Sequence, residues 1–187
     1  MVRIKPEIRF SFPAVLSVIL CTDTEGTAVL CLLSCVLHET GHIIAMIAEG
    51  KPPERIVFYG GGIKLSGSNS NSIPVIIGGC FVNFVLFTAF YFFGHNYVFR
   101  LFGMINFLMG IFNLMPISPL DGYNLLEKIL IKLLKPENVG PVLKMTEITA
   151  CLVCAPLIII FFLNGEINFS SVVFLFYLLV VDIIEKM

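Results

Sequence analysis

Apolar runs long enough to cross a lipid bilayer constrain this chain more than any other feature of its sequence. A helix needs about 20 mainly apolar residues to cross the hydrocarbon layer. Hydrophobic residues make up 57% of the 187 positions and charged residues only 13%, whereas a soluble domain typically carries about 25% charged residues. The chain therefore has too little polar surface for a soluble protein, and we expect an all-α polytopic membrane protein.

Charged residues divide the chain into six apolar segments, which we interpret as transmembrane helices. They are Ile8–Cys21, Gly26–Ala48, Ile73–Gly94, Val98–Met115, Thr146–Leu163 and Ile167–Ile184. The first segment is short enough to be a signal-peptide core or a re-entrant segment instead. No small-residue cleavage site follows it, so we expect it to be retained.

The basic residues are distributed unevenly along these six segments. If the N-terminus is cytosolic, every lysine and arginine except Arg100 falls on the cytosolic side, and the outer loops "TDTEG" and "NGEIN" are acidic and short. Lysine and arginine concentrate in the cytosolic loops of membrane proteins. We therefore expect both termini to be cytosolic.

The longest loop follows the second segment and contains the stretch "RIVFYGGGIKL", residues 55–65. Its β-branched and aromatic residues flank Gly60, Gly61 and Gly62, which predicts a β-hairpin on the cytosolic side. A flexible connector is the alternative. A hairpin edge could accept an extended substrate as an added strand, and the three glycines would leave room for that approach.

Two histidines and a glutamate interrupt the second apolar segment, in the stretch "LSCVLHETGHIIAMIAEGK". His38 and His42 are four residues apart, so a helix places them on one face, at the separation that two ligands of one metal ion need. Glu39 can reach a water molecule at that metal, which is the general-base arrangement of a His-Glu-x-x-His motif. A buried polar cluster satisfied by hydrogen bonds is the alternative. Ionisable residues inside a span are costly, which favours a functional role.

A catalytic zinc ion needs a third protein ligand and an open position. His95 lies at the opposite end of the bilayer in the six-segment arrangement. Asp121 lies in "FNLMPISPLDGYNLL", which follows the fourth segment as it reaches the cytosolic side. The segment count therefore places Asp121 at the depth of the two histidines. The alternative role for Asp121 is the N-cap of a helix that starts near Gly122.

The sequences "HETGH" and "NLMPISPLDG" resemble the two signature motifs of the site-2 protease family, which are intramembrane zinc metalloproteases. The resemblance covers Leu33 to about Leu126. It implies that His38, His42 and Asp121 bind one zinc ion per chain and that Glu39 is the catalytic base. We accordingly expect one integral-membrane domain over residues 1–187. Its catalytic core would span about 26–126, and its C-terminal helices 142–187.

A third motif of the family, Gly-Pro-x-x-Asn, corresponds to "GCFVN" in the third apolar segment. Gly79 and Asn83 are kept, and Cys80 replaces the proline. The change affects the expected helix geometry more than the expected catalysis. Asn83 would donate a hydrogen bond to the substrate backbone or to the developing oxyanion, or else it would link helices.

The resemblance implies regulated intramembrane proteolysis of membrane-embedded or membrane-tethered substrates. The short six-segment form most resembles the sporulation branch, represented by stage IV sporulation protein FB, which activates a membrane-tethered sigma-factor precursor. We therefore expect a bacterial cell-membrane protein that contacts a transmembrane substrate, the lipid bilayer and a regulatory membrane partner. The net charge of −1 gives no reason to expect nucleic acid. The alternative function is a non-catalytic zinc-binding scaffold or a metal-handling protein, in which Glu39 would have no role.

The cysteines have two interpretations. Cys31 and Cys35 precede the histidines at helical spacing and could be additional soft metal ligands. Cys151 and Cys154 form a Cys-x-x-Cys motif, which signals redox chemistry in soluble folds. Because both pairs lie in apolar segments, we interpret all four as small residues that let helices pack closely.

Overall fold

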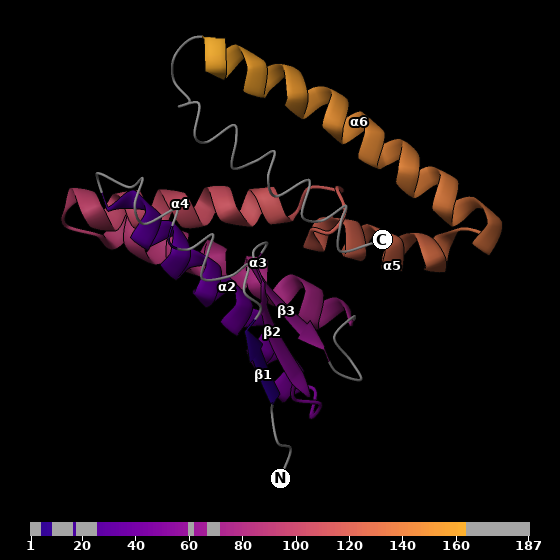
Figure 1. The fold of residues 1–187 in the computed structure, drawn as a ribbon, viewed down its shortest axis with the longest axis horizontal. Helices are drawn as coiled ribbons and strands as arrows, with labels where there is room; N and C mark the ends of the chain where they lie inside the picture. The colour runs from indigo at the N-terminus through magenta and orange to yellow at the C-terminus, as the bar shows by residue number, and fades with distance from the viewer. Residues whose placement is uncertain (1–4, 9–16, 18–25, 60–61, 67–71, 164–187) are drawn as a thin grey trace. The chain divides into compact units, whose positions relative to one another are not determined.

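The computed structural model describes residues 5–8, 17, 26–59, 62–66 and 72–163. Contacts divide the chain into two compact units, Met1–Met115 and Pro116–Met187, and each is described by itself. Helices make up most of the described residues (Figure 1). This confirms a mostly helical protein, and a small sheet in the first unit adds to the helices.

Three apolar helices form the body of the first unit. Helix α2 spans Thr27–Ala48, and α3 spans Ile73–Phe87 and continues as the π-helical segment η1, Thr88–Phe92. These two helices, of 22 and 20 residues, are long and apolar enough to cross a membrane. Helix α4, Tyr97–Asn113, is a shorter apolar helix of 17 residues.

Residues beside these helices explain where the helices begin and end. Gly26 precedes α2 with a φ of 76°, a left-handed conformation that suits glycine, and Gly50 follows the helix with a φ of 72°. At the start of α3 the Ser72 hydroxyl accepts a hydrogen bond from the Val75 amide at 3.4 Å, and a proline occupies the first turn. The Asn96 side chain accepts from the Phe99 amide in the same way at the start of α4.

Four of the six expected spans correspond to helices that the structure describes. The second, third and fourth correspond to α2, to α3 with η1, and to α4. The fifth, Thr146–Leu163, is the later part of a longer helix that begins at Pro136. The first and sixth lie outside the described residues, except that Ile8 ends a β-strand and Ser17 is described alone. The count of six therefore stays a prediction.

The first unit also contains a three-stranded sheet in the order β1-β2-β3. Strands β2, Arg55–Tyr59, and β3, Gly62–Ser66, pair antiparallel, with Tyr59 opposite Gly62. Strand β1, Lys5–Ile8, pairs with β2 in parallel, and this third strand was not predicted. Because β2 is central, the outer edges of β1 and β3 are the ones that the described strands leave unpaired. The cytosolic side of the sheet stays a prediction.

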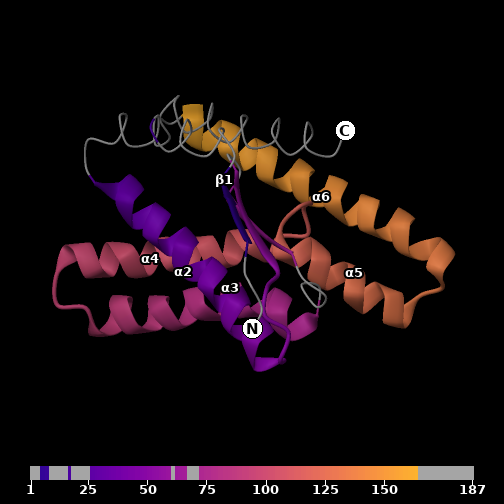
Figure 2. The ribbon, with the colours of Figure 1, turned by 60° about the horizontal axis from the view of Figure 1, so that its bottom comes forward.

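The backbones of α2 and α3 approach each other without an intervening side chain. A Cβ atom added to Gly41 would collide with the carbonyl of Gly78 and lie 2.9 Å from Cγ2 of Val82. A Cβ atom added to Gly78 would lie 2.7 Å from the Gly41 carbonyl oxygen. Small residues at such crossings allow the close van der Waals packing that holds membrane helices together. Figure 2 shows α2 crossing α3 and α4.

Polar side chains lie inside this helix group and apolar side chains lie outside. Ser34 of α2 donates a hydrogen bond to Oδ1 of Asn106 of α4 at 2.9 Å, and both side chains are fully buried. By contrast, Ile44 and Phe81 are 62% and 64% exposed. An exposed apolar surface of this kind marks contact with lipid or with other proteins. The arrangement agrees with a membrane-embedded unit.

The second unit contains α5, Asp121–Leu133, and α6, Pro136–Leu163. The turn before α5 is fixed by the Ser118 amide, which donates to the Glu147 carboxylate of α6 at 3.1 Å. Leu120 occupies the cap position and Asp121 is the first helical residue. The alternative role of Asp121 as the N-cap does not hold, because the helix begins at Asp121 itself and not at Gly122. A carboxylate in the first turn still interacts favourably with the helix dipole.

The glycine contact between α2 and α3 predicts a stability effect. Gly41→Ala should lower the thermal unfolding midpoint of the purified protein in detergent, since the new methyl group meets backbone atoms that cannot move aside. Overpacking of this kind costs about 1–3 kcal/mol. Gly140→Ala is the matched control, because an added Cβ there meets nothing within 4 Å. Circular dichroism measures both midpoints, and an unchanged midpoint in Gly41→Ala would contradict the close approach.

Candidate metal centre

His38 and His42 lie on the buried face of α2, one helical turn apart. They are 5% and 7% exposed, and their Nε2 atoms are 3.1 Å apart. The two rings meet edge to face, with centroids 4.7 Å apart. The sequence predicted that both residues share one helix face, and the structure shows in addition that their Nε2 atoms meet.

The orientation of His42 is set by α3. Its Nδ1 atom lies 2.7 Å from the carbonyl oxygen of Val75. A carbonyl oxygen only accepts hydrogen bonds, so Nδ1 carries the proton and donates it. The neutral ring then has its lone pair on Nε2, the atom that faces His38. Histidines that bind metals usually donate their other ring nitrogen to such an acceptor, because this fixes the tautomer.

The geometry of the pair fits a divalent metal ion. Two nitrogens that each lie 2.0–2.1 Å from a tetrahedral zinc ion are about 3.3 Å apart. The observed 3.1 Å is close to that separation. Gly79 of α3 faces the same atoms, since an added Cβ would lie 2.5 Å from Nε2 of His42 and 2.7 Å from Nε2 of His38. Only a glycine leaves this space to the two imidazoles.

Glu39 is placed beside the histidine pair. A carboxylate oxygen of Glu39 and one ring nitrogen from each of His38 and His42 all lie within 4.8 Å of one another. The glutamate is half-buried, whereas both histidines are buried. A carboxylate at this distance can accept a proton from a water molecule that sits between it and the two ring nitrogens.

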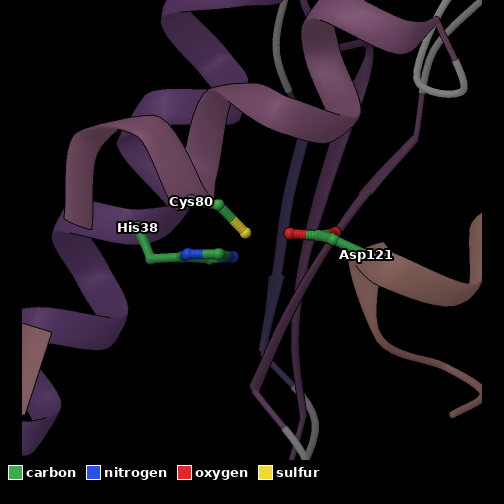
Figure 3. A group of neighbouring side chains, drawn as sticks. All are labelled: His38, Cys80 and Asp121. Carbon is green, nitrogen blue, oxygen red and sulfur yellow. The ribbon is translucent and has the colours of Figure 1, made fainter. Parts of the chain in front are cut away.

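The structure also places Cys80 beside His38. Its side chain is 2% exposed, and its sulfur lies within 4.8 Å of a ligand nitrogen of His38. Figure 3 shows the thiol and the His38 ring. The sequence comparison with the family motif singled out Cys80 only as a replacement for proline. Its proximity to His38 depends on how α3 packs against α2, and no sequence spacing indicates that.

Asn83 lies one turn beyond Gly79 on α3 and is fully buried. Among the described residues, neither the amide nitrogen nor the amide oxygen of its side chain has a hydrogen-bond partner. A role in linking helices would require a hydrogen bond to another helix. Burying an amide without a partner costs free energy, so such a group usually has a functional reason.

The remaining predicted site residues are Asp121 and the three glycines at 60–62. Asp121 begins α5 in the second unit, and its role as third ligand stays a prediction. Gly62 begins β3, whereas Gly60 and Gly61 lie outside the described residues.

The cysteine interpretation needs a correction. Cys31, Cys35 and Cys151 are exposed in the described part of the chain, so they do not fill tight contacts between its helices. The helical stripe that the histidines share is instead continued by Ser34 and Met46, which are buried. The side chain of Cys154 is not among those described.

Residues 89–155 match the family model "Peptidase family M50". The curated relative "Putative zinc metalloprotease sll0528" from Synechocystis sp. (strain ATCC 27184 / PCC 6803 / Kazusa) is 34% identical over 127 residues. This match covers 61% of the present chain and 34% of the relative, so the chain spans about a third of the length of the curated relative it matches.

A solved structure shares the fold. The Site-2 Protease from Methanocaldococcus jannaschii matches with a TM-score of 0.61 at 21% sequence identity, and the match covers 96% of this chain and 88% of that chain. The chain is therefore similar to peptidase family M50 over residues 89–155, and it shares the fold of a site-2 protease.

Proposed function

We propose that this chain is an intramembrane zinc metalloprotease that hydrolyses peptide bonds of membrane-embedded or membrane-tethered proteins. The observation that carries the proposal is the convergence of the His38 and His42 Nε2 atoms at 3.1 Å inside an apolar helix group, with Glu39 beside them. A structural zinc site has no need of a base, and the glutamate favours hydrolysis over the alternative of a non-catalytic scaffold or metal-handling protein.

His38, His42 and Asp121 would hold one zinc ion per chain. When bound, zinc lowers the pKa of a coordinated water to about 7 and polarises a carbonyl group. The residues of this chain supply the remaining steps. Glu39 accepts a proton from the attacking water and later gives it to the leaving amine. The Val75 carbonyl holds His42 in the tautomer whose Nε2 faces the site.

Asn83 would donate its amide N–H to the substrate carbonyl oxygen as negative charge develops there. The amide is fully buried on the face of α3 that carries Gly79, and no described residue accepts its hydrogen bond. A donor held in place without a partner needs no reorganisation when charge develops, and this is how oxyanion sites stabilise transition states.

The substrate must be extended before cleavage, because a helical peptide keeps its carbonyl groups in its own hydrogen bonds. The three-stranded sheet offers a way to hold such a segment. Its outer edges are β1 and β3, and either could take an extended peptide as an added strand. In the sequence, Gly60, Gly61 and Gly62 follow directly after β2, and they would allow close backbone approach.

The pattern of six apolar segments resembles the sporulation branch, so the proposed substrate class is a membrane-tethered regulator such as a sigma-factor precursor. The chain would lie in a bacterial cell membrane with cytosolic termini, in contact with lipid and with a regulatory membrane partner. The basic residues on the expected cytosolic side support this orientation.

Glu39→Gln tests the catalytic role. The variant should retain one zinc ion per chain, measured by mass spectrometry of the purified protein, and lose cleavage of a reconstituted membrane-tethered substrate. Loss of a general base costs about 10²–10⁴-fold in rate. Glu49→Gln, at the C-terminal end of the same helix, is the matched control and should cleave normally. Wild-type cleavage that survives a zinc chelator, or a near-normal rate in Glu39→Gln, would contradict the proposal.

Asp121→Asn tests the third ligand. The substitution should reduce both bound zinc and cleavage, because a neutral amide oxygen is a poorer ligand for a divalent cation than a carboxylate. It also removes a favourable helix-dipole interaction of about 0.3–1 kcal/mol. Glu137→Gln removes the same kind of interaction from the first turn of α6 and is the control. Full zinc content with normal cleavage in Asp121→Asn would show that the third ligand lies elsewhere.

Asn83→Leu tests whether the Asn83 amide serves cleavage or only the stability of the fold. Since the Asn83 amide has no described partner, leucine should raise the unfolding midpoint by removing a desolvation cost of about 1–3 kcal/mol. Cleavage should fall by about 10²–10³-fold with zinc retained. Asn106→Leu is the opposite control: it breaks the hydrogen bond from Ser34 and should lower the midpoint. A destabilised Asn83→Leu variant with full activity would assign Asn83 to structure.

A further inference from the structure

Cys80 combines three properties that packing alone does not explain. Its side chain is 2% exposed, its sulfur lies within 4.8 Å of a ligand nitrogen of His38, and the residue before it is Gly79, against which both imidazoles lie. A buried cysteine usually acts as a small apolar residue. Here the sulfur lies close to His38, one of the two histidines whose Nε2 atoms are 3.1 Å apart.

The distances allow the sulfur to share a metal ion with His38. Zinc–sulfur and zinc–nitrogen bonds of about 2.3 Å and 2.0–2.1 Å place the two ligand atoms about 3.5 Å apart in a tetrahedral site. The observed separation exceeds this by no more than about 1.3 Å. A small rotation of the cysteine side chain can supply that difference. In Figure 3 the thiol extends from α3 on the side of the His38 ring.

We infer that Cys80 is a thiolate ligand of the metal, beside His38 and His42, in the protein at rest. The inference rests on the proposed function, because it concerns the same metal. Coordination joins the sulfur to the ion, and the thiol proton is released to water. A soft thiolate favours zinc and similar thiophilic ions over hard cations such as magnesium or calcium.

Thiolate coordination would also have a consequence for reactivity. A catalytic zinc site has three protein ligands and an open position, whereas a site with four protein ligands is closed. If Asp121 binds as predicted, Cys80 fills the fourth position. The resting centre is then closed, and the sulfur must leave before a water molecule can take its place. Cys31 and Cys35 are exposed on α2, so neither can occupy the fourth position as readily as the buried Cys80.

X-ray absorption at the zinc edge tests this inference without measuring activity. The zinc-loaded, full-length wild-type protein should show a sulfur shell at about 2.3 Å in addition to nitrogen and oxygen at about 2.0–2.1 Å. Cys80→Ser should keep its zinc and lose the sulfur shell. Cys35→Ser, three residues before His38 on α2, is the matched control and should keep the shell. Cys80→Ala provides a second variant if the serine protein does not fold.

The possible spectra distinguish the two proposals. A wild-type spectrum with nitrogen and oxygen only would overturn the role of Cys80 and leave the proposed protease intact. A sulfur shell that persists in Cys80→Ser and Cys80→Ala would also overturn it and assign the sulfur to another cysteine. A wild-type protein that binds no zinc would overturn both the thiolate ligand and the proposed function.

Discussion

The close contact between α2 and α3 is the constraint on which the rest of the first unit depends. Gly41 and Gly78 let the two backbones touch, and Gly79 then lies against the imidazoles of α2. The hydrophobic effect contributes little to the association of helices within lipid. Van der Waals packing at this contact must therefore supply much of the free energy of association. The same contact brings the Val75 carbonyl to His42 and so selects its tautomer. Helix packing and metal-site geometry therefore have one cause.

Two asparagines of the first unit are both fully buried but differ in the hydrogen bonds of their side chains. Asn106 of α4 accepts a hydrogen bond from Ser34 and donates to the Phe102 carbonyl, so both ends of its amide are satisfied. Asn83 of α3 is as deeply buried, yet its amide has no partner among the described residues. The first joins α2 to α4. The second has no such link among the described residues, which is why we propose for it a role toward the substrate.

The sheet and the start of α5 show where sequence patterns were too weak. Strand β1 is four residues long and pairs with Arg55 and its neighbours, about fifty positions away in the chain. So short a run has no periodicity that could distinguish it from a connector, whereas the longer β2–β3 stretch carried β-branched residues around glycines. The alternative role of Asp121 as a helix cap was considered because aspartate suits that position, but the helix starts one residue earlier, after a turn in which the Ser118 amide donates to Glu147.

The sequence alone determined what depends on local spacing and on composition. Apolar runs implied helices in lipid, and the four-residue interval between His38 and His42 implied a shared helix face, because helical periodicity is a property of the chain itself. Only the tertiary structure decided which side of α3 meets that face. Helix α3 is apolar nearly all round, so no polar stripe indicates in advance that Gly79, Cys80 and Asn83 turn inward. That choice is made by the fit of glycine backbones against α2, a three-dimensional match that linear patterns do not contain.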